Sequence, residues 1–255
     1  MKQGTISLRL RRRILEHDPH GCLAWSAREE PAHPATRETA LVLCDVWDNH
    51  WCRGARERLA PLVPRMNETA KAARAKGILV VHAPSETMAF YEGSPARERA
   101  RSAPPVEPPL DRPWKDRPLP VGAPAPGFGC DSDGNTSPAH TILWTREHPG
   151  IEIDPARDIV SDQGRELYSY YRAHDIRNVL ILGVHTNFCI LRRSFAIKQL
   201  VKWGLFTALV RDLTDSMYSP EDPPYVSHEE GTRLVVEYIE KFWCPTCLSE
   251  DILRA

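Results

Sequence analysis

Short, uninterrupted apolar runs recur along this chain, and they constrain its fold more than any other feature. Each run has four to six residues, the usual length of a strand that is buried on both faces of a sheet. The runs lie at Ala40–Cys44, Ile78–Val81, Thr141–Thr145, Val179–Leu182 and Leu205–Val210. Helical patterns separate most of these runs. Because parallel strands need such crossover connections, the rhythm predicts an α/β protein with a mostly parallel sheet.

Four segments have the apolar spacing of amphipathic helices. They are expected at about residues 59–77, from about 162, at 189–203 and from 227. Gly77 and Gly204 follow the first and third segments, where glycine commonly ends a helix. Ser227 and Glu230 have the spacing of a capping box, which marks the start of the last helix.

Two segments interrupt this pattern. Residues 1–38 are polar and broken by prolines, although Ile6, Leu8 and Leu10 alternate as in a short strand or hairpin. Residues 84–140 are rich in proline and glycine, so we expect neither helix nor sheet there. The chain is thus expected to form one domain, with a core at about 39–243, an N-terminal extension and a long proline-rich insertion. We expect the insertion to be ordered and to cover the functional site or an oligomer interface.

Composition and charge exclude several classes of protein. The formal net charge of −1 provides no long-range attraction to nucleic acid or anionic membranes, and no apolar run approaches the roughly 20 residues of a membrane span. The N-terminus lacks the apolar segment of a secretory signal, and we interpret Arg9 and Arg11–Arg13 as a solvated strand face. The seven scattered cysteines are typical of a reducing cytoplasm rather than of a disulfide framework.

The stretch from Val179 to Ala196 contains the first candidate for chemistry. Its apolar strand ends at Gly183, a turn follows, and a helical pattern begins at Cys189. The first turn of a helix has N–H groups without partners and a positive dipole, and both favour the nucleophilic thiolate. The strand end also places Cys189 at the C-terminal edge of the sheet, where open α/β folds have their sites. A buried, inert cysteine is the alternative interpretation.

Asp45 ends the first apolar run, so its carboxylate is expected to point into the same crevice. Within hydrogen-bond distance of Cys189, it would take the thiol proton and later deliver it to a leaving amine. Taken alone, an acid at this position is more often a helix cap or a turn residue. The next residues form an aromatic and polar loop, in which Trp47 and His50 are candidates for shaping a pocket.

Four segments of the chain resemble the isochorismatase-like cysteine hydrolases, which include nicotinamidases, isochorismatases and N-carbamoyl amidohydrolases. The segments are L-V-L-C-D-V-W-D-N at 41–49, I-L-V-V-H at 78–82, L-I-L-G-V-H-T-N-F-C at 180–189 and A-L-V-R-D at 208–212. The resemblance covers most of residues 40–242 apart from the insertion. It implies a three-layer Rossmann-like fold with helices on both faces of the sheet. The family is usually oligomeric, so a homo-oligomer is expected.

The resemblance also implies a catalytic triad of Asp, Lys and Cys. Asp45 matches the position of the Asp, and Cys189 matches the nucleophile. A cis peptide bond between Val184 and His185 is implied as well. The N–H groups of His185 and Cys189 would then form the oxyanion hole that stabilises the transition state.

The lysine of the triad is where this chain departs from the family. In the family it follows the third strand, and this chain has W-T-R-E-H-P-G there. The nearest cation is Arg146, which supplies positive charge but gives up no proton at neutral pH. Lys115 in the insertion is the other candidate.

Metal binding is weakly signalled, and no cofactor is expected. Nicotinamidase-like members hold a divalent metal with an Asp-x-His pair and a further His, and in this chain Asp48 and His50 have that spacing, with His82 as a further histidine. We interpret Asp48, His50 and His82 as a loop acid and two ordinary histidines. Cys244 and Cys247 have zinc-ligand or redox spacing, but no second pair accompanies them, so we interpret them as unrelated thiols.

These features favour a cysteine hydrolase that cleaves a carbon–nitrogen bond of a small amide or carbamoyl substrate. Cys189 would form an acyl-enzyme, Asp45 would move the proton and Arg146 would supply positive charge. One alternative is a non-catalytic binding or scaffold protein on the same fold, suggested by the missing lysine and the long insertion. Another is an isochorismatase-type vinyl-ether hydrolase, whose chemistry does not need the cysteine. The expected partners of the hydrolase are a small-molecule substrate and further copies of the chain.

Overall fold

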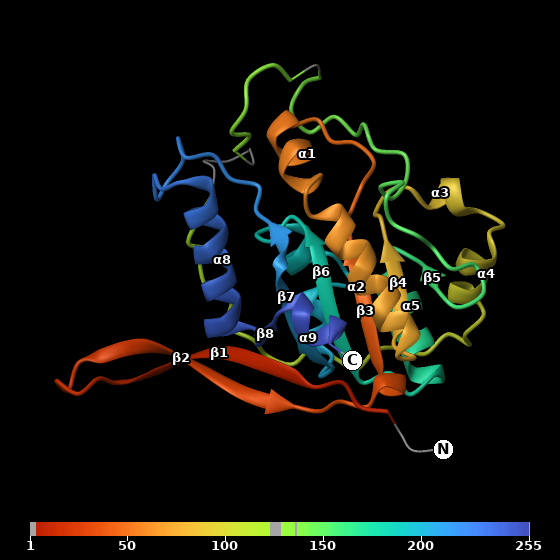
Figure 1. Cartoon of the computed structure of the whole chain (residues 1–255), viewed down its shortest axis with the longest axis horizontal. Coiled ribbons are helices and arrows are strands. Elements are labelled where there is room, and N and C mark those ends of the chain that lie inside the picture. Colours follow the sequence, from red (N-terminus) through yellow and green to blue (C-terminus); the bar gives the residue numbers. More distant parts are fainter. Residues whose placement is uncertain (1–3, 123–128, 136, 255) are drawn as a thin grey trace.

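The computed structural model describes residues 4–122, 129–135 and 137–254. Within these ranges an eight-stranded sheet has the strand order β2-β1-β8-β7-β6-β3-β4-β5 (Figure 1). The strands are β1 (Leu8–His17), β2 (Leu23–Ala32), β3 (Thr39–Cys44), β4 (Leu79–Ala83), β5 (Ile159–Val160), β6 (Asn178–Val184), β7 (Phe206–Asp215) and β8 (Thr246–Cys247). The strands β3 to β8 pair in parallel, and β1 pairs antiparallel with β2 and β8. The predicted α/β fold with a mostly parallel sheet is confirmed.

Helices cover both faces of the sheet and complete the three expected layers (Figure 1). They are η1 (Thr36–Glu38), α1 (Arg53–Leu59), α2 (Val63–Ala75), α3 (Met88–Tyr91), α4 (Pro95–Arg101), α5 (Gly164–Ala173), α6 (Cys189–Arg192), α7 (Ile197–Lys202), α8 (His228–Phe242) and α9 (Ser249–Leu253). On β3, Leu41 and Leu43 pack in the core with α1, α2 and α9, whereas Val42 and Cys44 pack in the core with α5 to α8. All four are fully buried, because successive strand residues face opposite sides and both sides are covered. Among the described residues, no helix is long and apolar enough to cross a membrane.

The apolar run at 141–145 is not a strand, so this prediction is wrong. The place beside β4 belongs instead to the fully buried Ile159–Val160 of β5. Ile142 is 55% exposed, and the segment ends beside Asp48, whose carboxylate accepts the N–H of Thr145 at 2.9 Å. An apolar run can therefore line a pocket instead of entering the sheet, and the sequence pattern does not separate the two.

The helical pattern after Cys189 splits into α6 and α7, so the continuous helix predicted for 189–203 is wrong. Arg193 ends α6 with an extended backbone, at a ψ of 151°. At the break, the N–H of Gly164 at the start of α5 donates to Ser194 Oγ at 3.0 Å. A Cβ on Gly164 would lie 2.0 Å from the Ser194 carbonyl oxygen, so only glycine allows this approach.

The insertion begins with two short helices, α3 and α4, where the sequence predicts none. Ser94 caps α4 by accepting the N–H of Arg97 at 3.3 Å, and Pro95 takes the first helical position, where its missing N–H removes no helical hydrogen bond. In the described residues from 102 to 158 that follow, no helix or multi-residue strand forms, as the proline content predicts. Trp114 fastens this segment to the end of α8 through a hydrogen bond to the Phe242 carbonyl (3.0 Å).

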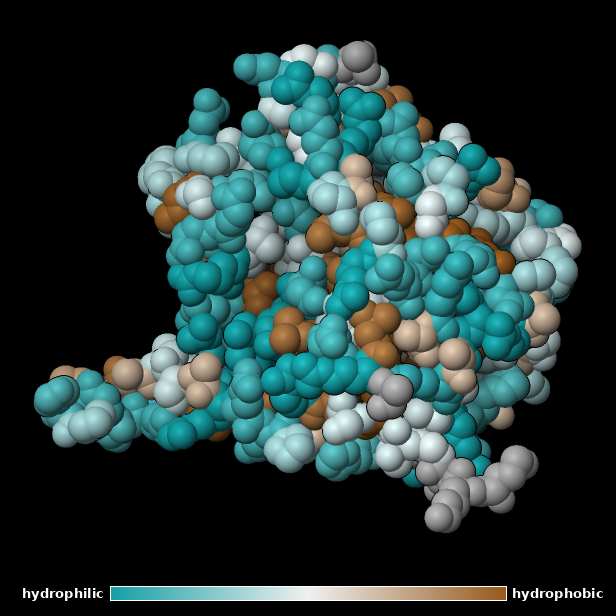
Figure 2. Space-filling model, in the orientation of Figure 1, coloured by the Kyte–Doolittle hydropathy of each residue, from teal (hydrophilic) through white to brown (hydrophobic). Residues whose placement is uncertain are grey.

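The N-terminal extension forms a long β-hairpin that joins the sheet through β1 and β8, as the alternation of its first residues predicts. Its far end projects from the body of the molecule as a mostly hydrophilic ribbon (Figure 2). The solvated face predicted for its arginines is wrong at two positions. Arg11 donates to Glu240 at 2.7 Å and Arg13 donates to Glu237 at 2.6 Å, both on α8. The hairpin is therefore held on α8 by charge-assisted hydrogen bonds.

Candidate functional site

Two adjacent strand ends create the candidate site. In the parallel pair of β3 and β6, Cys44 lies opposite Gly183, so Asp45 and the turn after Val184 meet at the C-terminal edge of the sheet. Gly183 makes this contact possible, because a Cβ there would lie 2.0 Å from the Cys44 carbonyl oxygen. Its φ of +118° is also a conformation that side chains disfavour. The buried strands thus determine which polar residues face each other.

The carboxylate of Asp45 is the centre of this site. The residue is fully buried, and its backbone has a left-handed φ of 52°. Its Oδ1 accepts the N–H of Ser85 at 2.8 Å, and its Oδ2 accepts a hydrogen bond from Arg193 Nε at 2.8 Å. The thiol of Cys189 also donates to this carboxylate. Residues that follow β3, β4 and β6 therefore converge on one acid.

Cys189 is the first residue of α6 and is 2% exposed. The turn before it contains a cis peptide bond between Val184 and His185. The backbone N–H of His185 interacts with the Cys189 sulfur. Asn187 anchors the turn by donating to the Met217 carbonyl at 2.8 Å and accepting the Met217 N–H at 2.9 Å. The sulfur is thus held beside backbone N–H groups by a rigid turn.

The cation in contact with Asp45 is Arg193, which corrects the expectation for Arg146. Arg193 lies four residues after Cys189, so one turn of chain supplies both the thiol and the positive charge. Arg146 is 45% exposed, and its Nε lies 3.9 Å from the Asp48 carboxylate instead. The sequence signal for Arg193 is the i, i+4 spacing, which places it on the same side of the chain as Cys189.

Lys115 does not reach the site either. It is exposed, and the neighbouring Trp114 is bonded to Phe242 at the C-terminal end of α8. Since α8 leads into β8, which is parallel to β7, this end of α8 lies at the opposite edge of the sheet from Cys189.

Burial controls the protonation of this cluster. It raises the pKa of the Cys189 thiol well above the ordinary value, and the neighbouring Asp45 adds to the effect. Burial also raises the pKa of Asp45, while Arg193 and the hydrogen bonds from Cys189 and Ser85 oppose the rise. The raised pKa of Cys189 favours the protonated thiol as its resting form. Burial thus opposes the thiolate that a helix start favours, and α6 has only four residues, so its dipole is weak.

An aromatic pocket of about 330 Å³ opens beside the thiol. Trp47 and Trp144 stack with 4.2 Å between ring centroids, and His50 stacks on Trp144 at 5.6 Å. The structure therefore places Trp47 and His50 in a pocket wall. Trp144 comes from the segment predicted as a strand, which is why the sequence did not suggest it. The pocket has the concave, largely aromatic character of small-molecule sites.

Few charges line this pocket. Burial lowers the pKa of His50 to about 3 and that of His185 to about 4, so both are neutral at pH 7. Glu86 also lines the pocket, with Oε2 3.9 Å from Nη2 of Arg193. No motif marks Glu86, because an acid just after a strand is common in loops.

The residues considered for a nicotinamidase-type metal do not form a donor set. His82 is fully buried, with Nδ1 2.7 Å from Glu147 and Nε2 3.1 Å from Asp158, so both ring nitrogens already have partners. In the described part of the chain, no group of three donors includes Asp48, His50 or His82. A metal of that type does not fit these residues, and no catalytic step is assigned to one.

The cysteine pair near the C-terminus is buried. Cys244 and Cys247 are free thiols, and burial raises the pKa of Cys244 to about 12. Neither belongs to a group of three donors among the described residues. This geometry agrees with two unrelated thiols.

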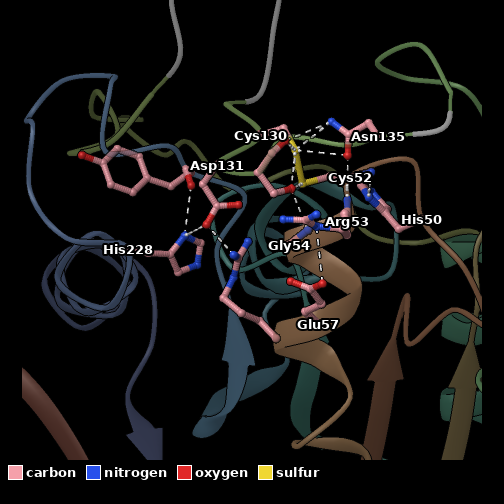
Figure 3. Close-up of a disulfide and its surroundings, with 12 residues drawn as sticks. His50, Cys52, Arg53, Gly54, Glu57, Cys130, Asp131, Asn135 and His228 are labelled. Atoms are coloured by element: carbon pink, nitrogen blue, oxygen red, sulfur yellow. Dashed lines mark hydrogen bonds and ion pairs between the residues drawn. A yellow bond between two sulfur atoms is a disulfide. The ribbon is translucent and has the colours of Figure 1, made fainter.

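A disulfide between Cys52 and Cys130 joins the insertion to the start of α1 (Figure 3). Next to it, the N–H of Gly54 donates to Ser132 Oγ at 2.8 Å, and Asn135 accepts the preceding N–H at 2.9 Å. The loop thus supplies hydrogen-bond acceptors for N–H groups in the first turn of α1, which have no partner within the helix. The expected reduced state is wrong for this pair, because cysteine counts cannot reveal which thiols meet. Disulfides are typical of oxidising compartments.

Comparison with solved structures shows the fold. A cysteine hydrolase from Pseudomonas syringae pv. phaseolicola 1448A is similar at 15% identity and a TM-score of 0.54, over 87% of this chain and 93% of that one. An isochorismatase family protein from Burkholderia thailandensis matches at 15% identity and 0.48, over 86% and 97%. An isochorismatase from Pseudomonas putida KT2440 matches at 10% and 0.49, over 84% and 90%. The first likeness shows that this chain has the fold of that cysteine hydrolase. No family model and no curated protein matches the sequence.

Proposed function

We propose that this protein is a cysteine hydrolase that cleaves the carbon–nitrogen bond of a small amide or carbamoyl substrate through an acyl-enzyme on Cys189. The observation that carries the proposal is the convergence of the buried Cys189 thiol and of Arg193 on the buried Asp45 carboxylate, which Arg193 contacts at 2.8 Å. Buried ionisable groups are costly, and they cluster at functional sites when they line a pocket. The fold shared with a cysteine hydrolase supports the same chemistry.

Acylation starts from the uncharged thiol. Asp45 takes the proton from Cys189 as the sulfur attacks the carbonyl carbon of the substrate. The N–H groups of His185 and Cys189 stabilise the negative charge on the carbonyl oxygen. The carbon–nitrogen bond then breaks, Asp45 delivers its proton to the leaving amine, and a thioester remains on the enzyme.

Deacylation uses the same groups with water in place of the thiol. Asp45 removes a proton from a water molecule that attacks the thioester carbon. The thiolate leaves and receives this proton, so the acid is released and Cys189 is a thiol again. Arg193 stays charged throughout, because a guanidinium gives up no proton at neutral pH.

The scaffold alternative rests on the missing lysine and on the long insertion, and the structure bears on the first of these. Arg193 supplies a cation in contact with Asp45, so this reason for the alternative no longer holds. The vinyl-ether alternative does not require the thiol, and the same experiment separates it from the amidase.

The test is ammonia release from a panel of small amides and carbamoyl compounds. Wild-type protein should release ammonia, whereas Cys189→Ala and Asp45→Asn should lose turnover with the fold intact by circular dichroism. Cys244→Ala is the matched control, since this thiol is also free and buried but lies outside the cluster. Turnover that survives in Cys189→Ala would exclude the acyl-enzyme, and activity on a vinyl ether in that variant would favour the alternative reaction.

Three further expectations remain predictions. Sedimentation velocity tests the homo-oligomer, and full activity after treatment with a chelator tests the absence of a metal cofactor. Cell fractionation tests the cytoplasmic location, and the Cys52–Cys130 disulfide is of a kind more typical of oxidising compartments.

A further inference from the structure

Two carboxylates share one guanidinium at the pocket. Arg193 lies 2.8 Å from Asp45 and 3.9 Å from Glu86. The pocket-lining His50 and His185 carry no charge at pH 7, and Arg193 is the one lysine or arginine among the described lining residues. The lining therefore carries one acid, Glu86, and one cation, Arg193, whose Nε is already engaged by the buried Asp45.

The backbone holds Glu86 at this place. Its φ of 68° is left-handed, and its N–H donates to Asp162 Oδ2 at 2.9 Å. The N–H of the preceding Ser85 donates to Asp45 at 2.8 Å. The segment that carries Glu86 is thus tied to the acid that contacts the thiol. Its side chain is 45% exposed, so the carboxylate lies at the open side of the pocket, where an entering ligand passes.

The pocket walls are suited to a cation as well. The rings of Trp47, Trp51, Trp144 and Phe188 line it. Arg193 and Arg192 already lie over Trp47 and Phe188, so the rings of Trp51 and Trp144 are the ones that attract an ammonium or pyridinium group. A negatively charged group would instead face the carboxylate of Glu86. The cation available to such a group is Arg193, whose Nε already contacts Asp45.

We propose that Glu86 is a specificity-determining residue that makes the pocket select ligands with a positive charge next to the scissile amide. That the amide is cleaved rests on the proposed hydrolase function. The preference for cationic ligands is a property of the pocket alone, so it can be measured without turnover.

The experiment compares three benzamides that differ at the meta position. The substituents are trimethylammonio, its uncharged isostere tert-butyl, and carboxylate. Each compound protects Cys189 from alkylation by iodoacetamide, and the concentration for half protection gives its affinity. In the wild-type protein the cation should bind about fivefold more tightly than the tert-butyl compound, as expected for one partly exposed charge. The carboxylate should bind most weakly.

Variants assign the preference to Glu86. Glu86→Gln should bring the cation and the tert-butyl compound close to equal affinity, and Glu86→Lys should place the carboxylate ahead of the cation. Glu92→Gln is the matched control, since Glu92 is a 60% exposed acid of the same segment that pairs with Arg101. This control should keep the wild-type order.

Three results would overturn the proposal: equal affinity for the two isosteres in wild type, an unchanged preference in Glu86→Gln, or no protection by the trimethylammonio compound at millimolar concentration. Ammonia release is measured in parallel on the same compounds. Cation-selective protection without ammonia release would defeat only the proposed reaction, whereas ammonia release without selectivity would defeat only the role of Glu86.

Discussion

Replacing Arg193 with methionine should weaken both the stability of the protein and the chemistry of the site. A hydrogen bond to a charged group contributes about 1.5–3 kcal/mol. Arg193 is 26% exposed and Asp45 is fully buried, so we expect a loss of about 2 kcal/mol in the free energy of unfolding. The same change raises the pKa of Asp45, because Arg193 is the strongest of the groups that lower it. Asp45 then needs a higher pH to accept the thiol proton, and the acid limb of the pH–rate profile moves upward.

Urea unfolding measures the first effect, and the pH dependence of kcat/KM, or of Cys189 alkylation, measures the second. Arg193→Lys keeps the charge and should restore most of the acid limb. Arg146→Met is the control, because this exposed side chain lies 3.9 Å from its acid and should change stability by less than about 0.5 kcal/mol. The reasoning is refuted if Arg193→Met unfolds at the wild-type urea concentration and keeps the wild-type acid limb.

Three other changes test the surroundings of the site. Burial alone would lower the pKa of His82, but two buried carboxylates outweigh it and raise the pKa to about 9. The stability from this proton is complete below the unfolded pKa near 6.5 and is lost as the pH rises through about 9. Urea unfolding should thus show that the free energy of unfolding falls by roughly 3 kcal/mol between these two pH values, and His82→Gln should abolish this pH dependence. Reduction of Cys52–Cys130 opens a cross-link with a separation of 78 residues, so the melting temperature should fall by an amount that corresponds to about 4 kcal/mol. The Ser double variant should not respond to reductant. Glu240→Gln removes the negative charge that pairs with two arginines of β1. The free energy of unfolding should fall by about 2 kcal/mol, and an unchanged urea midpoint would contradict this.

The part of the site that the sequence reveals is the part that the strands determine. Asp45 and Cys189 follow apolar runs that are easy to recognise, and the ends of parallel strands lie at one edge of the sheet. Their meeting therefore follows from the order of the runs and from Gly183, whose missing side chain allows the strand ends to touch. This reasoning needs no detail finer than which residue ends each strand.

The residues that the sequence misses depend on finer detail. Arg193 contacts Asp45 from the end of the four-residue α6, next to the contact between Ser194 and Gly164, which is distant in sequence. The two residues of β5 are too short to form a pattern. The apolar run at 141–145 has the composition of a strand but lines the pocket, so composition alone assigns it wrongly.

An arginine at this position has a consequence for how the site responds to pH. A lysine in contact with Asp45 would lose its proton at high pH, and with it the charge that keeps the carboxylate ionised. Arginine stays charged over the whole range in which the protein is folded, so the cation should cause no alkaline limb in the pH–rate profile. In the cluster formed by Asp45, Cys189 and Arg193, the proton then moves only between the carboxylate and the thiol. Their titrations are coupled, so the acid limb should report the pair and shift when either residue is replaced.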